Sequence, residues 1–463
     1  MASKKSRPLP DHLWRPMTQH KMLRGELPTR MVSAEGCFIT DEQGNRLLDA
    51  LAGLWCVNLG YGRTELADVA RSQMANLNFL APTMSSEPTI NLAEKIQQLM
   101  GFESHIYFTS SGAEAVETAI KMTRQYHFQS GKSGERRFKI ISRYRAYHGS
   151  TMGAMAATGQ AERKIGYEPG PVGFIHVGAP DPYRAHARLT PSEHAEECVR
   201  QLEETIIYEG AETVAAFIME PIISGGGVLV PPDNYISRVR EVCSRYGVLL
   251  IFDEVVSGFG RLGKMFGYQC WETEADIFTF AKGMGSGYLP VAATAVKGSI
   301  FESFDGEPAG RDHFRQINTY GGHPVVSAVT LKVIEMVEEE RLVDNAAKVG
   351  AYLMEQLQGS LADHPFVGEI RGKGLLIGIE LVEDRETKVP LPDERMASIV
   401  GDCLSNGVIV GRNSNTIPSR TNVILIAPPL VISETEADQI VETLTAAMCR
   451  VLQKYGVAIL DVK

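Results

Sequence analysis

Two charged residues of the chain each follow a short, mainly apolar run directly. Lys282 comes after Ile277–Ala281 and is followed by three glycines within five residues. Asp253 comes after Val248–Phe252, about thirty residues upstream. Such runs predict buried parallel strands, and the carboxyl ends of these strands are where ligands bind in open α/β sheets. A lysine and an aspartate at two such ends predict a pyridoxal phosphate (PLP) site, in which the lysine binds the aldehyde carbon and the aspartate binds the pyridine nitrogen.

The chemistry expected of these two residues follows from burial and charge. Burial lowers the pKa of a lysine and makes its neutral, nucleophilic amine accessible. The carboxylate of Asp253 would keep the pyridine nitrogen protonated, so that the ring accepts the electrons of a breaking C–H bond. A surface lysine and a metal site at Asp253 and Glu254 are the alternatives. The glycines after Lys282 argue against the first, and the lack of a nearby histidine cluster argues against the second. We therefore expect no metal and a structural role for Glu254.

A PLP site also needs a phosphate cradle and a group against the ring, and two loops offer candidates. Ser110–Glu114 lies between an expected strand and an expected helix. A serine N-cap there leaves backbone N–H groups at the positive end of the helix to bind an anion, although an ordinary capped helix is the alternative. Tyr147 and His148 precede Gly149 in a second loop, where an aromatic ring could lie against the cofactor.

Glu220 precedes a proline and a glycine triplet, Gly225–Gly227. We expect Glu220 to be a buried acid near the cofactor. The triplet does not match the GxxxxGK[ST] pattern of phosphate loops, so we interpret it as a flexible turn.

The segments that position these residues alternate between strand-like and helix-like patterns from about residue 100 to 300. The predicted strands are His105–Thr109, Phe138–Arg143, Gly173–Val177, Ala215–Met219, Val248–Phe252, Asp276–Ala281 and Val291–Val296. The predicted helices between them include Ala113–Tyr126, Ser192–Glu209 and Asn234–Tyr246. This alternation predicts an α/β fold with a mainly parallel, seven-stranded sheet and helices on both faces.

The two ends of the chain have a different pattern. Gly36–Leu51 reads as a hairpin, and the C-terminal third combines helical spacing with strand-like segments. These helices are expected at Ser327–Glu340 and Asp344–Leu361, and these strands within Val367–Val382 and Val423–Ile432. We expect a large PLP-binding domain over residues 76–330 and a small α+β domain built from residues 1–75 and 331–463.

Composition narrows the class of protein. The chain has 463 residues, of which 44% are hydrophobic, and a formal net charge of −10, which argues against nucleic acid or an anionic membrane as the main partner. Its seven cysteines form no CxxC pair, which is typical of reduced cytosolic thiols. No stretch reaches the length needed to cross a bilayer, and the basic N-terminus has no apolar stretch behind it. We expect a cytoplasmic protein.

These pieces together resemble the class III aminotransferases, the fold-type-I, PLP-dependent family of ω-amino acid and amine transaminases. The resemblance covers almost the whole chain. Its motifs are Leu51–Asn58, Ser111–Ala115, Tyr147–Ser150, Met219–Pro221, Asp253–Val255, Gly258–Arg261, Ala281–Gly283 and Asn318–Pro324.

The resemblance implies a role for each matching residue. Lys282 would bind the cofactor and move protons, and Asp253 would pair with the pyridinium. Val255 and Tyr147 would pack on the two faces of the ring. The remaining cofactor-binding residues would be Ser111, Gly112 and Ala113 at the phosphate, with His148 and Glu220 nearby.

Two further residues carry implications for assembly and substrate. Thr319 would reach the phosphate of the neighbouring subunit, which implies a homodimer with sites at the interface and leaves open a tetramer. Trp55 would line the substrate pocket.

The chain departs from the family pattern at two positions. Many relatives have serine where this chain has Ala113, so one hydroxyl contact to the phosphate is absent. The 4-aminobutyrate branch usually has glutamine where this chain has Val256, which favours the pyruvate-using branch.

Relatives in that branch bind the carboxylate of pyruvate with a mobile arginine, for which Arg412 is the candidate and Arg420 the alternative. The segments His12–Thr18 and Gly411–Asn413 are most similar to taurine–pyruvate aminotransferases.

The expected reaction moves an amino group from an ω-amino acid or amine, such as taurine or β-alanine, to pyruvate. The alternatives are 4-aminobutyrate or another amine with a different acceptor, a PLP enzyme that does not transaminate, and a catalytically silent PLP-binding protein. The intact Lys282 and Asp253 argue against the silent protein. A nucleotide-binding dehydrogenase would need a GxGxxG turn, which Ser110–Glu114 does not supply.

Overall fold

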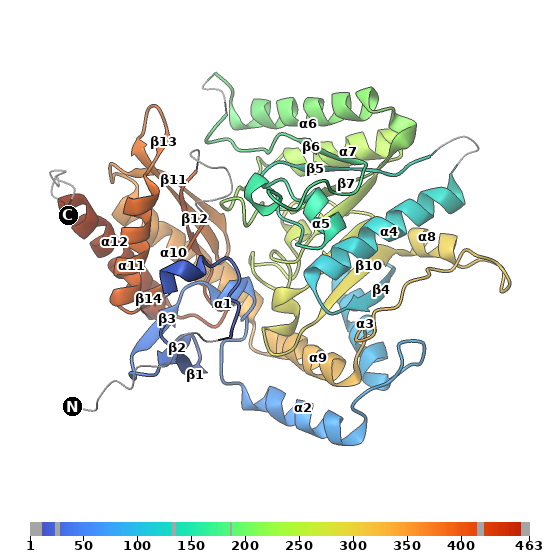
Figure 1. The fold of residues 1–463 in the computed structure, drawn as a ribbon, viewed down its shortest axis with the longest axis horizontal. Coiled ribbons are helices and arrows are strands. Elements are labelled where there is room, and N and C mark those ends of the chain that lie inside the picture. The colour runs from blue at the N-terminus through green and yellow to red at the C-terminus, as the bar shows by residue number, and fades with distance from the viewer. Residues whose placement is uncertain (1–11, 24–27, 132–135, 186–187, 414–420, 455–463) are drawn as a thin grey trace.

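The computed structural model describes residues 12–23, 28–131, 136–185, 188–413 and 421–454. Three sheets lie within these ranges. The largest occupies the right half of Figure 1, and the two smaller sheets lie in the left half. Among the described residues, no helix is both long and apolar enough to cross a membrane.

The largest sheet has seven strands in the order β4-β10-β9-β8-β7-β5-β6. Their bounds are β4 Ser104–Thr109, β5 Lys139–Arg143, β6 Phe174–Val177, β7 Val214–Met219, β8 Leu249–Asp253, β9 Ile277–Phe280 and β10 Ala292–Lys297. Strand β10 pairs antiparallel with both neighbours, and the other neighbouring pairs are parallel. The predicted mainly parallel α/β sheet of seven strands is confirmed.

The two faces of this sheet are covered by different helices. Helix α4, Gly112–Ser130, packs on one face, where Ile218 and Ile251 join its apolar side chains. The other face packs under α3, α6 and α7, where Phe217 and Phe252 are buried. Because consecutive strand residues point to opposite faces, Asp253 extends from β8 toward the α4 side.

In the part of the chain that the structure describes, six helices surround the large sheet, and three of them, α4, α6 and α7, were predicted to within about four residues at each end. The six are α3 Glu87–Met100, α4 Gly112–Ser130, α5 Met152–Ala157, α6 Pro191–Tyr208, α7 Tyr235–Tyr246 and α8 Gly298–Phe301. Helix α6 begins with a capping box at Thr190 and Glu193 and a proline in its first turn, as its sequence favours.

The four-stranded sheet joins the two ends of the chain. Its strands are β1 Met31–Glu35, β2 Phe38–Asp41, β3 Arg46–Asp49 and β14 Val408–Ile409, in that order. The predicted N-terminal hairpin is the β2–β3 pair, and Asp41 closes its turn by accepting hydrogen bonds from the backbone of Gln43 and Asn45.

The remaining sheet comes from the C-terminal third. Its strands are β11 Val367–Lys373, β12 Leu376–Asp384, β13 Val389–Pro390, β15 Gly411–Arg412 and β16 Val423–Ile426. The strand expected at Val423–Ile432 ends at Ile426, because Pro428 and Pro429 follow and cannot donate to a strand ladder.

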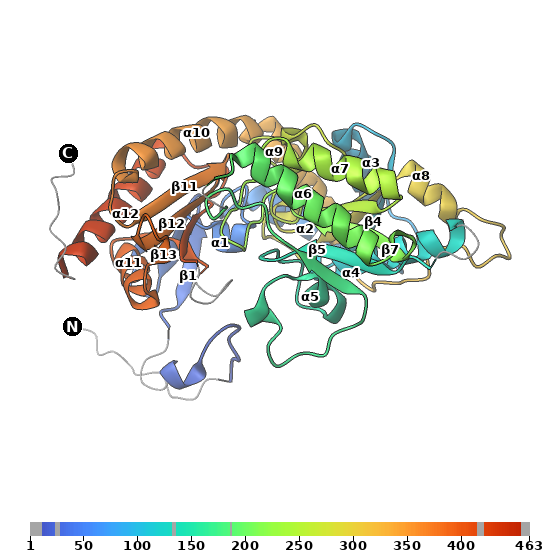
Figure 2. The same ribbon diagram turned by 90° about the horizontal axis from the view of Figure 1, so that it is seen from above.

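The other helices connect and cover these sheets. They are α1 Ala52–Trp55, α2 Thr64–Asn76, α9 Pro324–Glu339, α10 Leu342–Leu361, α11 Asp393–Ser405 and α12 Glu434–Lys454. Helix α9 buries Val333 and Val337 among the apolar residues of the chain ends, and Ile334 among those under the large sheet. Seen from above in Figure 2, α9 and α10 run along one side of both halves. The domain limits at residues 75 and 330 stay a prediction, and the second falls within α9.

Candidate active site

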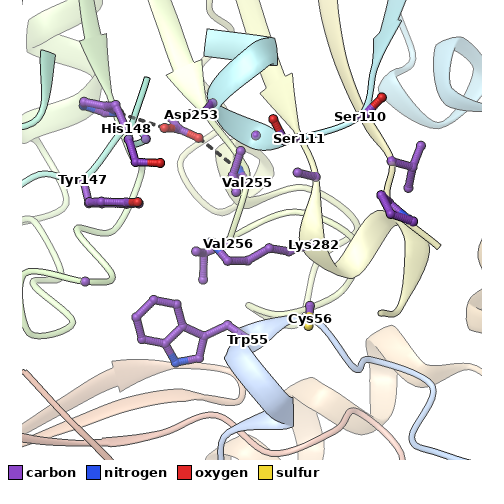
Figure 3. Close-up of a pocket in the computed structure, with 18 of the residues that line it drawn as sticks. Trp55, Cys56, Ser110, Ser111, Tyr147, His148, Asp253, Val255, Val256 and Lys282 are labelled. Atoms are coloured by element: carbon purple, nitrogen blue, oxygen red, sulfur yellow. Dashed lines mark hydrogen bonds and ion pairs between the residues drawn. The ribbon is translucent and has the colours of Figure 1, made fainter. Parts of the chain in front are cut away.

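A cavity of about 460 Å³ lies at the carboxyl ends of β8 and β9. Residues from the loops after β4, β5 and β7 line it together with α1. Most of the predicted site residues meet here: Trp55, Ser111, Gly112, Ala113, Tyr147, His148, Glu220, Asp253, Val255 and Lys282. Figure 3 shows Lys282 between Trp55 on one side and the pair of Asp253 and His148 on the other.

Lys282 begins a short 3-10 helix, Lys282–Gly285, directly after β9. Its φ of 46° lies in the left-handed region that residues with a side chain rarely adopt. Protein surrounds the side chain except where it borders the cavity, and its Nζ lies 5.7 Å from the centre of the Trp55 ring. Burial lowers the pKa of Lys282, while the carboxylates of Asp253 and Glu220 act in the opposite direction. The net shift of the Lys282 pKa is downward, which is the direction that makes its neutral, nucleophilic amine more accessible.

Asp253 is held by side chains on both of its oxygens. Its Oδ2 lies 2.7 Å from Nδ1 of His148, and its Oδ1 accepts from the Thr279 hydroxyl at 3.1 Å and from the Val255 backbone at 3.2 Å. Asp253 is 4% exposed, and the His148 side chain is 0% exposed. The parallel register of β8 and β9 pairs Asp253 with Thr279, which explains the hydroxyl contact. The carboxylate therefore has a fixed orientation in the cavity.

The N-terminus of α4 forms another wall of the cavity. Ser111 is the N-cap, and its Oγ accepts from the Glu114 backbone at 3.3 Å. The Glu114 carboxylate in turn accepts from the Ser110 backbone at 2.8 Å. The first N–H groups of a helix have no partner within it, and the helix dipole is positive there. A Cβ at Gly112 would lie 3.2 Å from both methyl groups of Val255, so a larger residue at this wall would require Val255 to shift.

Glu220 fixes the loop that carries Tyr147. Its Oε1 accepts from the Tyr147 backbone at 3.1 Å, and its Oε2 accepts from the Ser224 backbone at 2.9 Å. Burial raises the pKa of Glu220, and the positive charge that His148 can carry acts against this shift. Glu220 is thus a buried acid that ties the loop after β5 to the loop after β7.

Two of the predicted residues do not line this cavity. Thr319 is exposed in the turn before α9 and does not line it. Arg412 is exposed at the end of β15, and its Nη1 donates to the Asp393 carbonyl at 3.5 Å. Arg420 lies outside the described residues.

The alternation along β15 explains the position of Arg412. Gly411 pairs with Leu425, whose side chain packs in the same cluster as Trp55, next to the cavity. Arg412 pairs with Ile424, whose side chain packs on the opposite side of the sheet. The prediction that Arg412 reaches the substrate is therefore not supported by its direction in this structure.

Sequence reasoning missed several residues of the site. Thr279 holds Asp253, and its signal was a polar residue inside an otherwise apolar strand. Cys56 lines the cavity beside Trp55, and Ser110 and Val256, which belong to the predicted motifs but were not predicted as site residues, line it as well. Within the described ranges, no group of three or more His, Cys, Asp or Glu side chains is placed to hold a metal ion.

The chain is similar to known aminotransferases along nearly all of its length. Residues 22–448 match the class-III aminotransferase family. An uncharacterized aminotransferase of Bacillus subtilis (strain 168), YhxA, is 48% identical over 410 residues, which cover 89% of each protein. The taurine–pyruvate aminotransferase of Bilophila wadsworthia is 40% identical over 447 residues, covering 96% of this chain and 97% of that one. The putrescine–pyruvate aminotransferase of Pseudomonas aeruginosa is 37% identical over 438 residues, with coverages of 93% and 92%.

Solved structures agree with this assignment. An aminotransferase of Bacillus anthracis is 47% identical, with a TM-score of 0.91 over 95% of this chain and 96% of that one. The ω-transaminase of Pseudomonas jessenii in complex with PMP is 35% identical, with a TM-score of 0.91 and coverages of 97% and 98%. The sequence and its fold thus place the chain in the class III aminotransferase family, whose members are PLP-dependent enzymes of fold type I.

Proposed function

We propose that this aminotransferase moves an amino group from an ω-amino acid or amine, such as taurine or β-alanine, to pyruvate. The products would be an aldehyde or ketone and L-alanine. The observation that carries the proposal is the meeting of Lys282, Asp253 and the N-terminus of α4 in one cavity of about 460 Å³. The similarity to pyruvate-using relatives at 37% and 40% identity supports pyruvate as the acceptor.

The residues of the cavity fit PLP. The N-terminus of α4, with Ser111, Gly112 and Ala113, would hold the phosphate, since a positive helix end binds anions. The fixed carboxylate of Asp253 would hold the pyridine nitrogen. The missing Cβ of Gly112 keeps the space beside Val255 open, and Val255 would pack on the ring.

The remaining cavity residues complete this assignment. Tyr147 would pack on the second face of the ring. His148 would orient Asp253 through the 2.7 Å contact, and Glu220 would hold the Tyr147 loop in place.

The side chains of the protein would then act in sequence. Bound PLP supplies an electrophilic carbon for the amino group and a ring that accepts the electrons of the breaking C–H bond. The Nζ of Lys282, once displaced by the donor amine, would take the proton from the donor carbon, because its lowered pKa favours the neutral base. Asp253 would keep the ring nitrogen protonated throughout. Trp55 would confine the donor above Lys282.

Pyruvate needs a cation for its carboxylate, and taurine needs one for its sulfonate. A guanidinium group suits both anions because its paired N–H donors match two oxygens. Arg412 and Arg420 are the candidates. The direction of β15 favours Arg420, because Arg412 faces away from the cavity.

We also propose that the enzyme is a homodimer in which Thr319 reaches the site of the partner. Thr319 is exposed and does not line the cavity of its own chain, which is compatible with this role. Exposed apolar side chains near the same turn, among them Phe79, Ile317 and Tyr320, give a second copy a surface to bury.

A second candidate donor is a diamine. Similarity to the relative named putrescine–pyruvate aminotransferase supports this candidate, at 37% identity over most of both chains. A diamine offers a second cation where taurine offers an anion, so the two donors make opposite demands on the pocket.

A donor panel with pyruvate held fixed tests the proposal. Taurine, β-alanine, hypotaurine, putrescine, 4-aminobutyrate and 1-phenylethylamine would each be assayed for alanine and for the aldehyde or ketone product. We expect one alanine for each donor consumed, with the highest kcat/KM for taurine or β-alanine. Formation of glutamate from 2-oxoglutarate, with no alanine from pyruvate, would instead establish a different acceptor. Conversion of one substrate without an acceptor would indicate a PLP enzyme that does not transaminate.

A further inference from the structure

A group of six charged side chains lies beside the glycine triplet Gly225–Gly227. It contains three cations and three carboxylates, so that its formal charges balance. We call it the arginine network, and its members are Arg145, Asp181, Arg184, Glu369, Arg371 and Glu380. Four of them are buried, and Arg184 and Glu369 are half-buried.

The arginine network joins two sheets. Arg371 on β11 lies 2.6 Å from Oε2 of Glu369 and 2.7 Å from Oε2 of Glu380. Arg184, in the loop after β6, donates from Nε to Oε1 of Glu380 at 2.6 Å. Arg145, in the loop after β5, forms an ion pair with Asp181. Loops from the large sheet are therefore tied to the C-terminal sheet through buried charges.

Two arginines of this network also hold the backbone after Gly225. Nη2 of Arg145 donates to the Gly226 carbonyl at 2.7 Å. Nη2 of Arg371 donates to the Gly227 carbonyl at 2.7 Å, and its Nε donates to the Val228 carbonyl at 3.0 Å. Three successive carbonyls thus point at two guanidinium groups, which are planar and fix the direction of each bond.

On the side that faces the C-terminal sheet, neighbouring side chains leave the glycine triplet little room to move. Gly227 has a φ of 109°, and a Cβ there would lie 2.8 Å from Nδ2 of Asn413. Nδ2 of Asn413 also donates to the Gly225 carbonyl at 3.5 Å. The triplet, interpreted from sequence as a flexible turn, is therefore held from both sides.

Gly225 carries the effect of this arrangement into the cavity. It lines the cavity, and a Cβ there would lie 3.7 Å from Cβ of Tyr147 and 4.0 Å from the ring of Trp55. A shift of the triplet would change the space between these two aromatic side chains, where the donor is expected to lie.

Stability alone is a weak explanation for such a network. Removing charges from water is costly, and a buried ion pair often stabilises a protein no more than apolar residues of the same size. We propose that Arg145 and Arg371 are positioning residues that hold the Gly225 wall of the cavity and so set the space available to the amine donor. That an amine donor fills this space rests on the function proposed above. That the two arginines hold the Gly225 wall in position does not depend on that function.

Hydrogen–deuterium exchange on the PLP-loaded enzyme tests the position of the wall directly. Arg371→Met should speed exchange in the segment 222–229, because the carbonyls of Gly227 and Val228 lose the donor that holds them. Arg240→Met is the control, because it breaks a half-buried ion pair with Asp276, at 2.7 Å, whose two residues make no contact with the triplet. The control should leave exchange in 222–229 unchanged. Arg371→Lys keeps the positive charge but lacks the planar guanidinium group, so it should give an intermediate rate of exchange. It replaces Arg371→Met if that variant does not fold.

Steady-state kinetics separate positioning from a merely structural role. Arg371→Met should raise the donor KM about tenfold while kcat and the absorbance of bound PLP stay near wild type, since the wall contacts the donor equally in the ground state and the transition state and its displacement removes only this uniform binding. Gly225→Ala adds a methyl group to the same wall without a clash. It should raise the KM of a bulky donor such as 1-phenylethylamine more than that of taurine.

The proposal is overturned if Arg371→Met and Arg371→Lys lower only the melting temperature, with exchange in 222–229 and donor KM equal to those of Arg240→Met. Failure of the proposed function has a different signature. The wild type would then form no alanine from any donor with pyruvate, while exchange in 222–229 would still decide the role of the network.

Discussion

The end of β8 and the end of β15 each carry a charged residue expected to act on substrate or cofactor, and the structure treats them differently. Asp253 is the last residue of a strand that is buried throughout, and it lies in the cavity with both oxygens held. Arg412 ends a two-residue strand and faces away from the cavity. In β8, burial of the whole strand determines where its last side chain points. In the two-residue edge strand β15, the register of pairing with β16 alone determines where Arg412 points.

Among the charged residues at the ends of buried strands, Lys282 should have the largest effect on activity when it is replaced. Lys282→Ala removes both the covalent link to PLP and the base at the donor carbon. We expect transamination to fall by at least about 10²–10⁴-fold, the usual contribution of a positioned acid–base group. Alanine formation from pyruvate is the measurement, and turnover at the wild-type rate would exclude the assignment.

Asp253→Asn should have the next largest effect. The amide cannot stabilise a protonated pyridine nitrogen as a carboxylate does, so we expect kcat to fall about 10²–10³-fold, as for loss of one preorganised electrostatic group. Thr279→Val is the graded comparison. It removes one hydrogen bond to the same carboxylate at 3.1 Å, which should cost about 1 kcal/mol or roughly fivefold in kcat. Equal effects of the two substitutions would contradict a special role for the charge.

Arg412 and Arg420, the two candidates for binding the carboxylate of pyruvate, test the conclusion drawn for β15. Arg420→Ala should raise the KM for pyruvate about tenfold or more, because a charge-assisted hydrogen bond to a carboxylate contributes about 1.5–3 kcal/mol. Arg412→Ala should leave this KM near wild type, and neither substitution should change the KM of an uncharged amine. A large effect at Arg412 alone would restore the interpretation made from sequence and require β15 to turn.

The smallest expected effect is on stability and comes from Glu254, next to Asp253. Burial raises the pKa of Glu254 to about 7, although Ser257, Tyr268 and Gly267 donate hydrogen bonds to it. The unfolded chain loses this proton near its ordinary pKa of 4.5, before the folded protein does. The free energy of unfolding should therefore fall as pH rises from about 4.5 to 7, by roughly 1–3 kcal/mol.

Urea unfolding at pH 5 and pH 8 measures this difference. Glu254→Gln should show a smaller fall between the two pH values than the wild type, whatever its constant offset. The same fall in both proteins would show that Glu254 is ionised at pH 5 in the folded state.

The sequence predicted the elements that are buried on two sides. All seven strands of the large sheet were expected within a few residues, because an apolar run between turns has few other solutions. Lys282, Asp253 and Ser111 were found for the same reason, since each follows a strand or begins a long helix. The cofactor class followed from their combination.

Other contacts depend on pairing between distant segments and could not be predicted. The bond from Thr279 to Asp253 requires the register of β8 and β9. The hydrogen bond from Arg371 to the Gly227 carbonyl joins residues that are 144 positions apart in the sequence. The direction of Arg412 depends on a two-residue pairing with β16. None of these leaves a local pattern in the sequence.

The central claim is that the ε-amino group at position 282 forms the covalent link to the cofactor. Borohydride reduction of the PLP-loaded enzyme, followed by proteolysis and mass spectrometry of the labelled peptide, tests it most directly. We predict one labelled site per chain, on Lys282. Label on another lysine, or no label after reduction of an enzyme that has bound PLP, would contradict the account.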